Sequence, residues 1–275
     1  MSSLLRFDDE KARQAEKQYH SPEVVEQRER LRRILALRPG ESVLDVGCGP
    51  GLQSAEMAAV VGPEGRVVGV DISETMLAMA QARSAGLPWV ELTRADALAL
   101  PFAEGVFDAA VATQVYEYVA DVDGALSELF RVMRPGGRVV ILDTDWDSLV
   151  LITSDRARAR RILDVWDEHL TDPRLPETLG PRLKRAGFEV VGHHVIPFLN
   201  LECHELTYSY GLIHFITDFV ATSRPDMASD VRDWAEELAR LAEEGSFFFS
   251  LNRYIVHARK SPAHLGGSSR LAPRV

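Results

Sequence analysis

Short apolar runs alternate along the first half of the chain with stretches in which apolar residues recur every three or four positions. The runs predict strands at residues 42–46, 66–70, 90–93, 106–112 and 138–142. The periodic stretches predict helices at 22–37, 52–61, 74–85 and 121–133, with Ser21 and Ser73 as caps of the first and third. An Arg-Pro-Gly-Gly sequence at 134–137 predicts a turn. This alternation is typical of an α/β fold.

The second half is less regular but completes the same fold. It predicts helices at 154–170 and 177–186, a strand at 188–196 and a last strand at 247–258. About 40 residues of helical pattern, broken near 223–225, separate these two strands. We therefore predict a doubly wound, mostly parallel seven-stranded sheet with helices on both faces and a helical cap between strands six and seven. The expected division is an N-terminal helical segment at 1–38, a core at 39–199 plus 245–260, the cap at 200–244 and a disordered tail at 261–275.

Composition narrows the class of protein. Hydrophobic residues make up 46% of the chain, so a full core can be buried. A formal net charge of −10 disfavours a phosphate backbone as substrate, and we expect no nucleic-acid partner. Two distant cysteines favour a reduced compartment. No apolar run reaches the roughly 18 residues that span a bilayer, and acids occupy the place of a signal peptide's apolar stretch. We expect a cytoplasmic protein without a membrane partner.

The first predicted strand leads into a glycine-rich turn, VLDVGCGPG, at residues 43–51. Such a turn lets backbone N–H groups approach a ligand closely. The dinucleotide fingerprint G-x-G-x-x-G requires glycine at position 52, which is Leu52 here. Asp45 would repel a pyrophosphate, whereas a cation such as S-adenosylmethionine is compatible with it. Asp71, at the end of the second strand, suits the ribose of either ligand.

Five motifs then follow in order: VLDVGCGPG, VGVDIS, RADALALPF, FDAAVATQVYEYV and LFRVMRPGGRVVILD. Together they resemble the class I, Rossmann-type S-adenosylmethionine-dependent methyltransferases over residues 38–145. The resemblance is greatest to the small-molecule group that includes ubiquinone/menaquinone C-methyltransferases and natural-product methyltransferases. It implies S-adenosyl-L-methionine as the cofactor.

The resemblance also implies roles for individual residues. The loop of Gly47, Cys48 and Gly49 lies against the methionine part of the cofactor, with Asp45 near its ammonium group. Asp71 binds the ribose, Ile72 and Met76 pack near the adenine, and Asp96 with Ala97 meets the adenine amine. Gln114 marks the boundary between cofactor and substrate. In related enzymes the segment before the first strand covers the cofactor mouth, where Tyr19 would shield the methionine end. A purely structural role for several of these residues stays open.

Cofactor motifs do not identify the methyl acceptor, so candidates come from the carboxyl ends of strands and from the cap. Carboxylates near the expected pocket favour a nitrogen or carbon acceptor, and an oxygen acceptor would need a base such as a histidine. The candidate catalytic residues are Glu117, Asp143, Asp145, His204 and His214. The candidate pocket residues are Tyr116, Tyr118, Trp146, Tyr208 and Phe215. We expect no metal site, because the adjacent His193 and His194 point to opposite faces of a strand.

The leading hypothesis is methyl transfer from S-adenosylmethionine to a small molecule by in-line displacement, with the cap positioning the acceptor. Alternatives are a non-catalytic cofactor-binding or partner subunit, an RNA or protein methyltransferase, and an NAD oxidoreductase. An RNA base-amine enzyme would carry an Asn/Asp-Pro-Pro-Tyr/Phe motif where this chain reads Thr-Gln-Val-Tyr at 113–116. The extended apolar cap is compatible with a homodimer.

Overall fold

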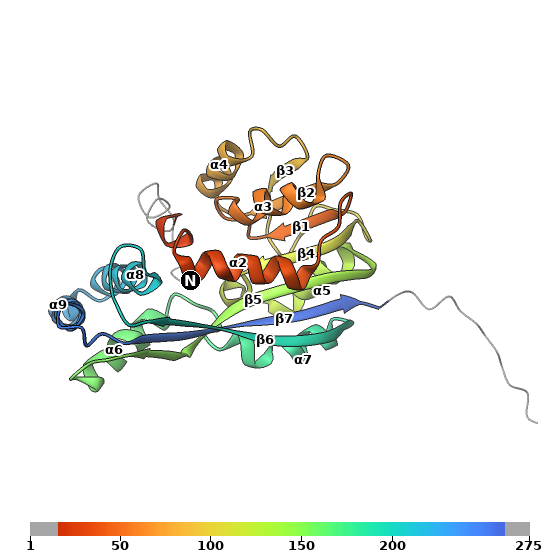
Figure 1. Cartoon of the computed structure of the whole chain (residues 1–275). Coiled ribbons are helices and arrows are strands. Elements are labelled where there is room, and N and C mark those ends of the chain that lie inside the picture. The colour runs from red at the N-terminus through yellow and green to blue at the C-terminus, as the bar shows by residue number, and fades with distance from the viewer. Residues whose placement is uncertain (1–15, 262–275) are drawn as a thin grey trace, which may run out of the picture.

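The computed structural model describes residues 16–261, and within them seven strands form one sheet in the order β3-β2-β1-β4-β5-β7-β6 (Figure 1). The strands are β1 (Ser42–Val46), β2 (Arg66–Asp71), β3 (Val90–Arg94), β4 (Phe107–Thr113), β5 (Met133–Leu151), β6 (Phe188–Asn200) and β7 (Phe249–Lys260). β1 to β5 pair in parallel, and β7 runs antiparallel to both β5 and β6. The predicted doubly wound, mostly parallel sheet is confirmed. The expected tail lies outside the described residues, apart from residue 261.

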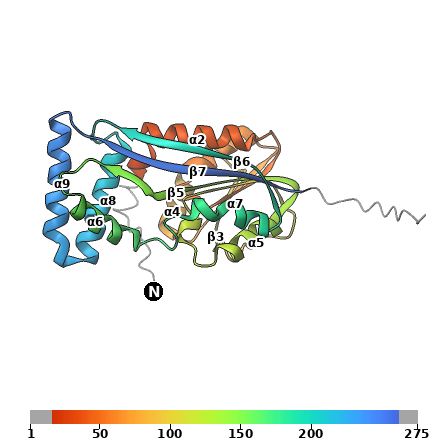
Figure 2. The ribbon, with the colours of Figure 1, turned by 90° about the horizontal axis from the view of Figure 1, so that it is seen from below.

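Helices cover both faces of the sheet (Figure 2). They are α2 (Pro22–Leu35), α3 (Leu52–Val61), α4 (Glu74–Arg83), α5 (Val122–Val132), α6 (Arg156–Asp167), α7 (Leu175–Arg185), α8 (Tyr208–Ser223) and α9 (Ala228–Glu243), with 3₁₀ turns η1 (Tyr116–Tyr118) and η2 (Pro225–Met227). α2, α3, α6, α8 and α9 bury their apolar faces in one core cluster, and α5 and α7 contribute to another. No helix in the described part of the chain is both long and apolar enough to span a bilayer.

The predicted caps differ in their chemistry. The hydroxyl of Ser73 accepts the backbone N–H of Met76 at 3.3 Å, as an N-cap does. Ser21 occupies the N-cap position of α2 before Pro22, but its hydroxyl has no hydrogen-bond partner in the described structure. α2 therefore depends on packing and on proline at its first turn more than on a side-chain cap.

The predicted extent of the fifth strand, 138–142, is wrong. Residues 134–137, predicted as a turn, and residues 143–151, beyond the predicted end, all belong to the 19-residue strand β5. The pairing with β4 shifts register between Met133 and Arg138, so the Pro-Gly-Gly sequence forms an irregularity inside the strand. Antiparallel pairing with β7 then carries β5 past the end of β4, because β7 supplies the hydrogen bonds that β4 no longer can.

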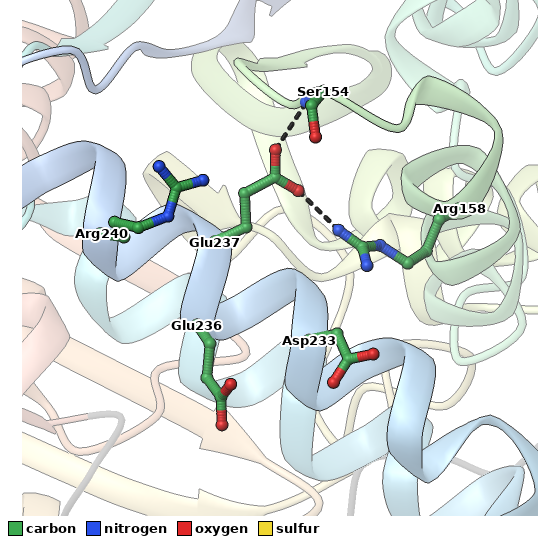
Figure 3. A pocket seen from close by; sticks show the side chains of 6 residues that line it. All are labelled: Ser154, Arg158, Asp233, Glu236, Glu237 and Arg240. Atoms are coloured by element: carbon green, nitrogen blue, oxygen red, sulfur yellow. Dashed lines mark hydrogen bonds and ion pairs between the residues drawn. The ribbon is translucent and has the colours of Figure 1, made fainter.

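The predicted cap between strands six and seven is present as α8, η2 and α9. Figure 3 shows how α9 is fixed to the core beside the start of α6. The carboxylate of Glu237 accepts hydrogen bonds from the Ser154 N–H and from Arg158 Nη2, each at 2.6 Å, and its side chain is 7% exposed. Asp233, Glu236 and Arg240 line the same hollow. A largely buried ion pair of this kind holds the cap in one orientation.

Candidate active site

The glycine loop between β1 and α3 has a backbone that only glycine adopts easily. Gly47, Gly49 and Gly51 have φ of +66°, +52° and +76°. A Cβ on Gly47 would stand 2.3 Å from Cγ2 of Val115, so the loop passes directly against the chain that follows β4. The N–H of Cys48 donates to the Val70 carbonyl at 3.0 Å, which ties the loop to the end of β2.

Asp71, at the carboxyl end of β2, fixes the same loop from its other side. Its Oδ2 accepts the N–H of Gly49 at 2.9 Å and its Oδ1 accepts the N–H of Ser73 at 2.8 Å. Burial raises the pKa of this carboxyl group, and the backbone hydrogen bonds oppose that shift. The carboxylate that was predicted to bind the ribose thus lies beside the glycine loop.

Asp45 is a buried carboxyl group within β1. Its side chain is 2% exposed, and Oδ2 accepts the hydroxyl of Ser54 at 2.5 Å. Burial raises the pKa of Asp45 to about 7, and the nearby charge of Asp71 acts in the same direction. Cys48 is also buried, and burial raises the pKa of its thiol, which agrees with a filler of the loop and not with a nucleophile.

The residues expected around the adenine follow the ends of β2 and β3, which are neighbours in the sheet. Ile72 is 57% exposed although it is apolar, and Asp96 is exposed as well, with Oδ1 accepting the N–H of Leu98 at 2.9 Å. Met76 and Ala97 are buried. An exposed apolar side chain and an exposed carboxylate that follow neighbouring strands are compatible with an adenine surface, and this assignment stays a prediction.

Two carboxyl groups with no solvent exposure meet beside the end of β4, Glu117 from the turn η1 and Asp143 from within β5. Glu117 Oε2 accepts the N–H of Thr144 at 3.2 Å and Nε1 of Trp146 at 3.4 Å. Asp143 Oδ1 accepts the N–H of Val115 at 3.1 Å. Among the described residues, Glu117 Oε1 and Asp143 Oδ2 have no hydrogen-bond partner. We call Glu117 and Asp143 the carboxyl pair.

The environment of the carboxyl pair favours bound protons. Burial raises the pKa of Glu117 to about 7, and burial together with the charge of Glu117 holds the pKa of Asp143 well above its usual range. Gln114 precedes the pair in a left-handed conformation, φ +55°, and its Nε2 donates to Thr144 Oγ1 at 3.0 Å. A non-glycine residue held in that conformation points to a functional constraint at this turn.

Arg253 of β7 is the buried cation next to the carboxyl pair, and its positive charge lowers the pKa of both carboxyl groups. It is 1% exposed, donates to Gln27 Oε1 and to the hydroxyl of Tyr208 at 2.6 Å each, and lies 4.7 Å from the ring centres of Phe198 and Tyr208. No role was predicted for Arg253 from the sequence. The signal that could have found it is its position on the buried face of the strand, in alternation with buried apolar residues.

Tyr19, expected to shield the cofactor, is placed near both parts of the site. Burial and the charge of Asp71 raise the pKa of its hydroxyl to about 12, while Arg253 lowers it. The phenol therefore lies within electrostatic reach of the ribose-side carboxylate and of the buried guanidinium. The role of Tyr19 as a cover of the cofactor mouth stays a prediction.

A group of aromatic rings adjoins the carboxyl pair, and we call it the aromatic cluster. It consists of Tyr118, Trp146, Trp166, His169 and Phe219. The rings of Trp166 and His169 are 4.0 Å apart between centroids, and Trp146 and Phe219 each stand 5.6 Å from Trp166. Tyr118 and Trp146 were predicted as pocket residues. The other three were not, and they come from α6, the segment after it and the cap helix α8.

Several predicted residues are not brought to the carboxyl pair. His204 is half exposed before α8, with Nδ1 accepting the N–H of Leu206. His214 is exposed on α8 and its Nδ1 contacts the Tyr210 carbonyl. Asp145 follows Asp143 by two residues but is only partly buried.

Exposure therefore counts against His204 and His214 as bases for an enclosed reaction. Two predicted pocket residues, Tyr116 and Phe215, are packed in core clusters, Tyr116 with no exposure. Residues 16–261 contain no group of three side chains arranged to hold a metal ion.

Comparison with known proteins identifies the class of domain. Residues 44–141 match the family model described as a methyltransferase domain. The chain thus resembles the class I, Rossmann-type S-adenosylmethionine-dependent methyltransferases, and the prediction made from its motifs is confirmed.

Two curated relatives show how far the similarity extends along the chain. An uncharacterised 37.1 kDa protein in a transposon of Streptomyces fradiae is 36% identical over 236 residues, covering 83% of this chain and 65% of that protein. The demethylmenaquinone methyltransferase of Symbiobacterium thermophilum is 41% identical over 109 residues, covering 38% of this chain and 43% of that enzyme. The chain therefore spans less than two thirds of the length of these curated relatives.

Solved structures share the fold. A Haemonchus contortus phosphoethanolamine N-methyltransferase in complex with S-adenosyl-L-methionine has a TM-score of 0.60 at 19% identity, covering 94% of this chain and 58% of that one. The [4+2]-cyclase SpnF has a TM-score of 0.56 at 24% identity, covering 87% and 81%. At these identities the likeness shows the fold alone.

Proposed function

We propose that the protein transfers a methyl group from S-adenosylmethionine to a small-molecule acceptor. One observation carries the proposal: the glycine loop, Asp71 and the carboxyl pair converge where β1, β2 and β4 end, beside the middle of β5. Ligands of open α/β sheets bind at the carboxyl ends of strands, so this is the expected place for a cofactor and an acceptor to meet.

The described residues fit a cation with an adenosyl group. Gly47, Cys48 and Gly49 would hold its methionine part, and Asp45 would face the ammonium group. Asp71 would accept the ribose hydroxyls, since its carboxylate already lies at the loop. The adenine contacts would be Ile72, Met76, Asp96 and Ala97, with Gln114 at the boundary with the acceptor. When bound, the cofactor supplies a sulfonium methyl group for in-line displacement.

The chain's own residues would orient the acceptor and manage its proton. The carboxyl pair lies in a water-excluded interior with two unpartnered oxygens in the described structure, so Glu117 or Asp143 can accept a hydrogen bond from an acceptor X–H group. We favour a nitrogen or carbon acceptor over oxygen. The cap of α8 and α9 would exclude water during transfer.

A non-catalytic or differently catalytic binder is the second candidate, because a protein named as a [4+2]-cyclase shares this fold. Such a protein would bind S-adenosylmethionine without consuming it. An RNA or protein substrate has no comparable support. A cytoplasmic location and a homodimer also stay proposals, and light scattering on the purified protein tests the dimer.

The test is incubation of the purified protein with methyl-labelled S-adenosylmethionine and a small-molecule extract of its host, followed by mass spectrometry. Label in a new small molecule, lost in Glu117→Ala and in Asp71→Ala, supports methyl transfer. Intact binding of S-adenosylhomocysteine without label in any molecule favours the second candidate. Label in RNA or protein would contradict the small-molecule assignment.

A further inference from the structure

The antiparallel end of the sheet carries apolar side chains on both of its faces. One face is core: Ile196 and Phe198 of β6 and Leu251 of β7 are buried in the cluster that α2 and α8 also join. The opposite face would be polar in an ordinary antiparallel sheet with one side in water. Here it holds six large apolar side chains that are 37–58% exposed: Val150, Ile152, Val195, Leu199, Leu201 and Phe248.

Strand register places these side chains in one patch, which we call the apolar face. Val150 and Leu199 both pair with Ser250, so the three residues form a row across β5, β7 and β6. Directly paired residues of antiparallel strands point to the same side of the sheet. The next pairs inward are Pro197 with Asn252 and Val195 with Tyr254.

Residues just beyond the strand ends extend the apolar face outward. The N–H of Ile152 donates to the Phe248 carbonyl at 3.1 Å, and Phe248 stands between two buried phenylalanines, so its side chain points away from the core. Leu201 directly follows the last residue of β6. On the same side of the sheet, α7 covers the other end of these strands, where Gly180 lies against His193 (Figure 2).

Both free edges of this part of the sheet are blocked against strand pairing. β6 is the last strand of the sheet within residues 16–261, and its Pro197 lacks the N–H that a further strand would need. β5 runs past the end of β4, and the edge that this leaves free is broken by a register shift between Asp145 and Val150. A partner is therefore expected on the apolar face and not along an edge.

The apolar face is large enough for a protein contact. A large side chain covers about 150–250 Å², so six that are roughly half exposed present about 400–700 Å² of apolar surface. The largest apolar patch of a typical monomer is about 300–600 Å². With the polar positions of the same rows included, the apolar face approaches the roughly 800 Å² per partner of a standard interface.

The chemistry of the apolar face fits a second copy of this chain. A two-fold contact brings side chains close to their own copies, so a charge there would meet a like charge. None of the residues in these rows is charged, apart from the partly buried Asp145 that pairs with Asn252 at the inner end. Ser250, Asn252 and Tyr254 can each donate and accept a hydrogen bond. The lack of Lys and Arg in the rows, with a net charge of −10, disfavours nucleic acid and anionic membranes.

We propose that the apolar face docks against the apolar face of a second copy of the chain, so that two sheets pack face to face about a two-fold axis. The contact lies on β5, β6 and β7 and not on the cap helices. The inference goes beyond methyl transfer and does not depend on it, since it concerns a surface outside the glycine loop and the carboxyl pair.

The test is sedimentation velocity of the full purified chain at about 1–100 µM. We expect a monomer–dimer equilibrium with a Kd in about the micromolar range, because the interface is at the small end of the standard size. Leu199→Glu and Val150→Glu should each raise Kd by at least about 100-fold, since the two-fold axis buries two unpaired carboxylates. Leu199→Met keeps an apolar side chain of similar volume, so its Kd should stay within about 3-fold of wild type.

Val60→Glu is the matched control, because Val60 is an exposed apolar residue of α3 that lies outside the apolar face. It should dimerise as wild type does. Urea unfolding of each variant confirms that it is folded, and the midpoints should agree with wild type because the replaced side chains are exposed.

A chain that stays monomeric at 100 µM would overturn the proposal. A dimer that both Leu199→Glu and Val150→Glu leave intact would overturn it as well, because the contact would then lie on another surface such as the cap. Binding of a monomeric wild-type chain to vesicles of neutral phosphatidylcholine, lost in Leu199→Glu, would show instead that the apolar face meets a membrane.

Discussion

Replacement of Gly47 by alanine tests the geometry of the glycine loop directly. The new Cβ would stand 2.3 Å from Cγ2 of Val115 and 3.2 Å from its Cγ1, well inside the roughly 3.5–4.0 Å of a carbon–carbon contact. Val115 cannot move away easily, because its N–H is held by Asp143 and its β-branched side chain has few rotamers. The contact must therefore be relieved by displacement of the loop or of the turn after β4.

The expected cost has two parts. A left-handed non-glycine residue costs about 1–2 kcal/mol, and overpacking of a well-filled site costs about 1–3 kcal/mol more. Gly49→Ala is the matched control: its φ is +52°, but its Cβ would meet no described atom within 4 Å. We expect a loss of about 2–5 kcal/mol for Gly47→Ala and of about 1–2 kcal/mol for Gly49→Ala.

The assay is urea unfolding of both variants, of Val115→Ala and of the double variant Gly47→Ala/Val115→Ala. Removal of the valine methyl groups removes the steric conflict, so the double variant should be more stable than the sum of the two single changes predicts. Equal losses for Gly47→Ala and Gly49→Ala, or simple additivity in the cycle, would refute the reasoning.

Three further predictions concern the charged groups. Asp71→Asn replaces one acceptor oxygen by an N–H donor, which in one orientation of the amide faces the backbone N–H of Gly49. The affinity for S-adenosylhomocysteine, measured by calorimetry, should therefore fall by roughly 10- to 100-fold. An unchanged affinity would contradict the role of the carboxylate. Burial raises the pKa of Glu117 from 4.5, its ordinary value, to about 7 in the folded state. Between these two pH values the folded state therefore binds more protons than the unfolded state. The free energy of unfolding should fall as the pH rises from about 4.5 to 7. Glu117→Gln should reduce that slope in unfolding measured across this range, and an identical slope would argue against the shift. Arg253→Met leaves the buried Oε1 of Gln27 and the hydroxyl of Tyr208 without their charged donor, so it should cost about 2–5 kcal/mol in urea unfolding. A loss below about 1 kcal/mol would show that the guanidinium is not needed.

The cofactor half of the fold is predictable from the sequence because its signals are local. The strand at Ser42–Val46 and the helix at Leu52–Val61 are found with the predicted ends, since an apolar run and a helical period are each bounded there by glycine or proline. Asp71 falls beside the loop because the ends of neighbouring parallel strands meet at one edge of the sheet.

The acceptor half is less predictable because distant segments build it. The extension of β5 beyond residue 142 depends on pairing with β7, about 100 residues later in the chain, so no local signal predicts it. Neither His169 nor Arg253 lies in a recognisable motif. Their place at the site is visible only once folding has brought α6, β7 and η1 together. The opposite error also occurred: Phe215 of the cap was predicted to line the pocket, but its side chain is buried in the hydrophobic core.

The most direct test of the central claim is calorimetric titration of the purified chain with S-adenosylhomocysteine, with NADH and Asp71→Ala as comparisons. We predict one bound S-adenosylhomocysteine per chain, much weaker binding to Asp71→Ala and no binding of NADH. Absence of S-adenosylhomocysteine binding, or a preference for NADH, would contradict it.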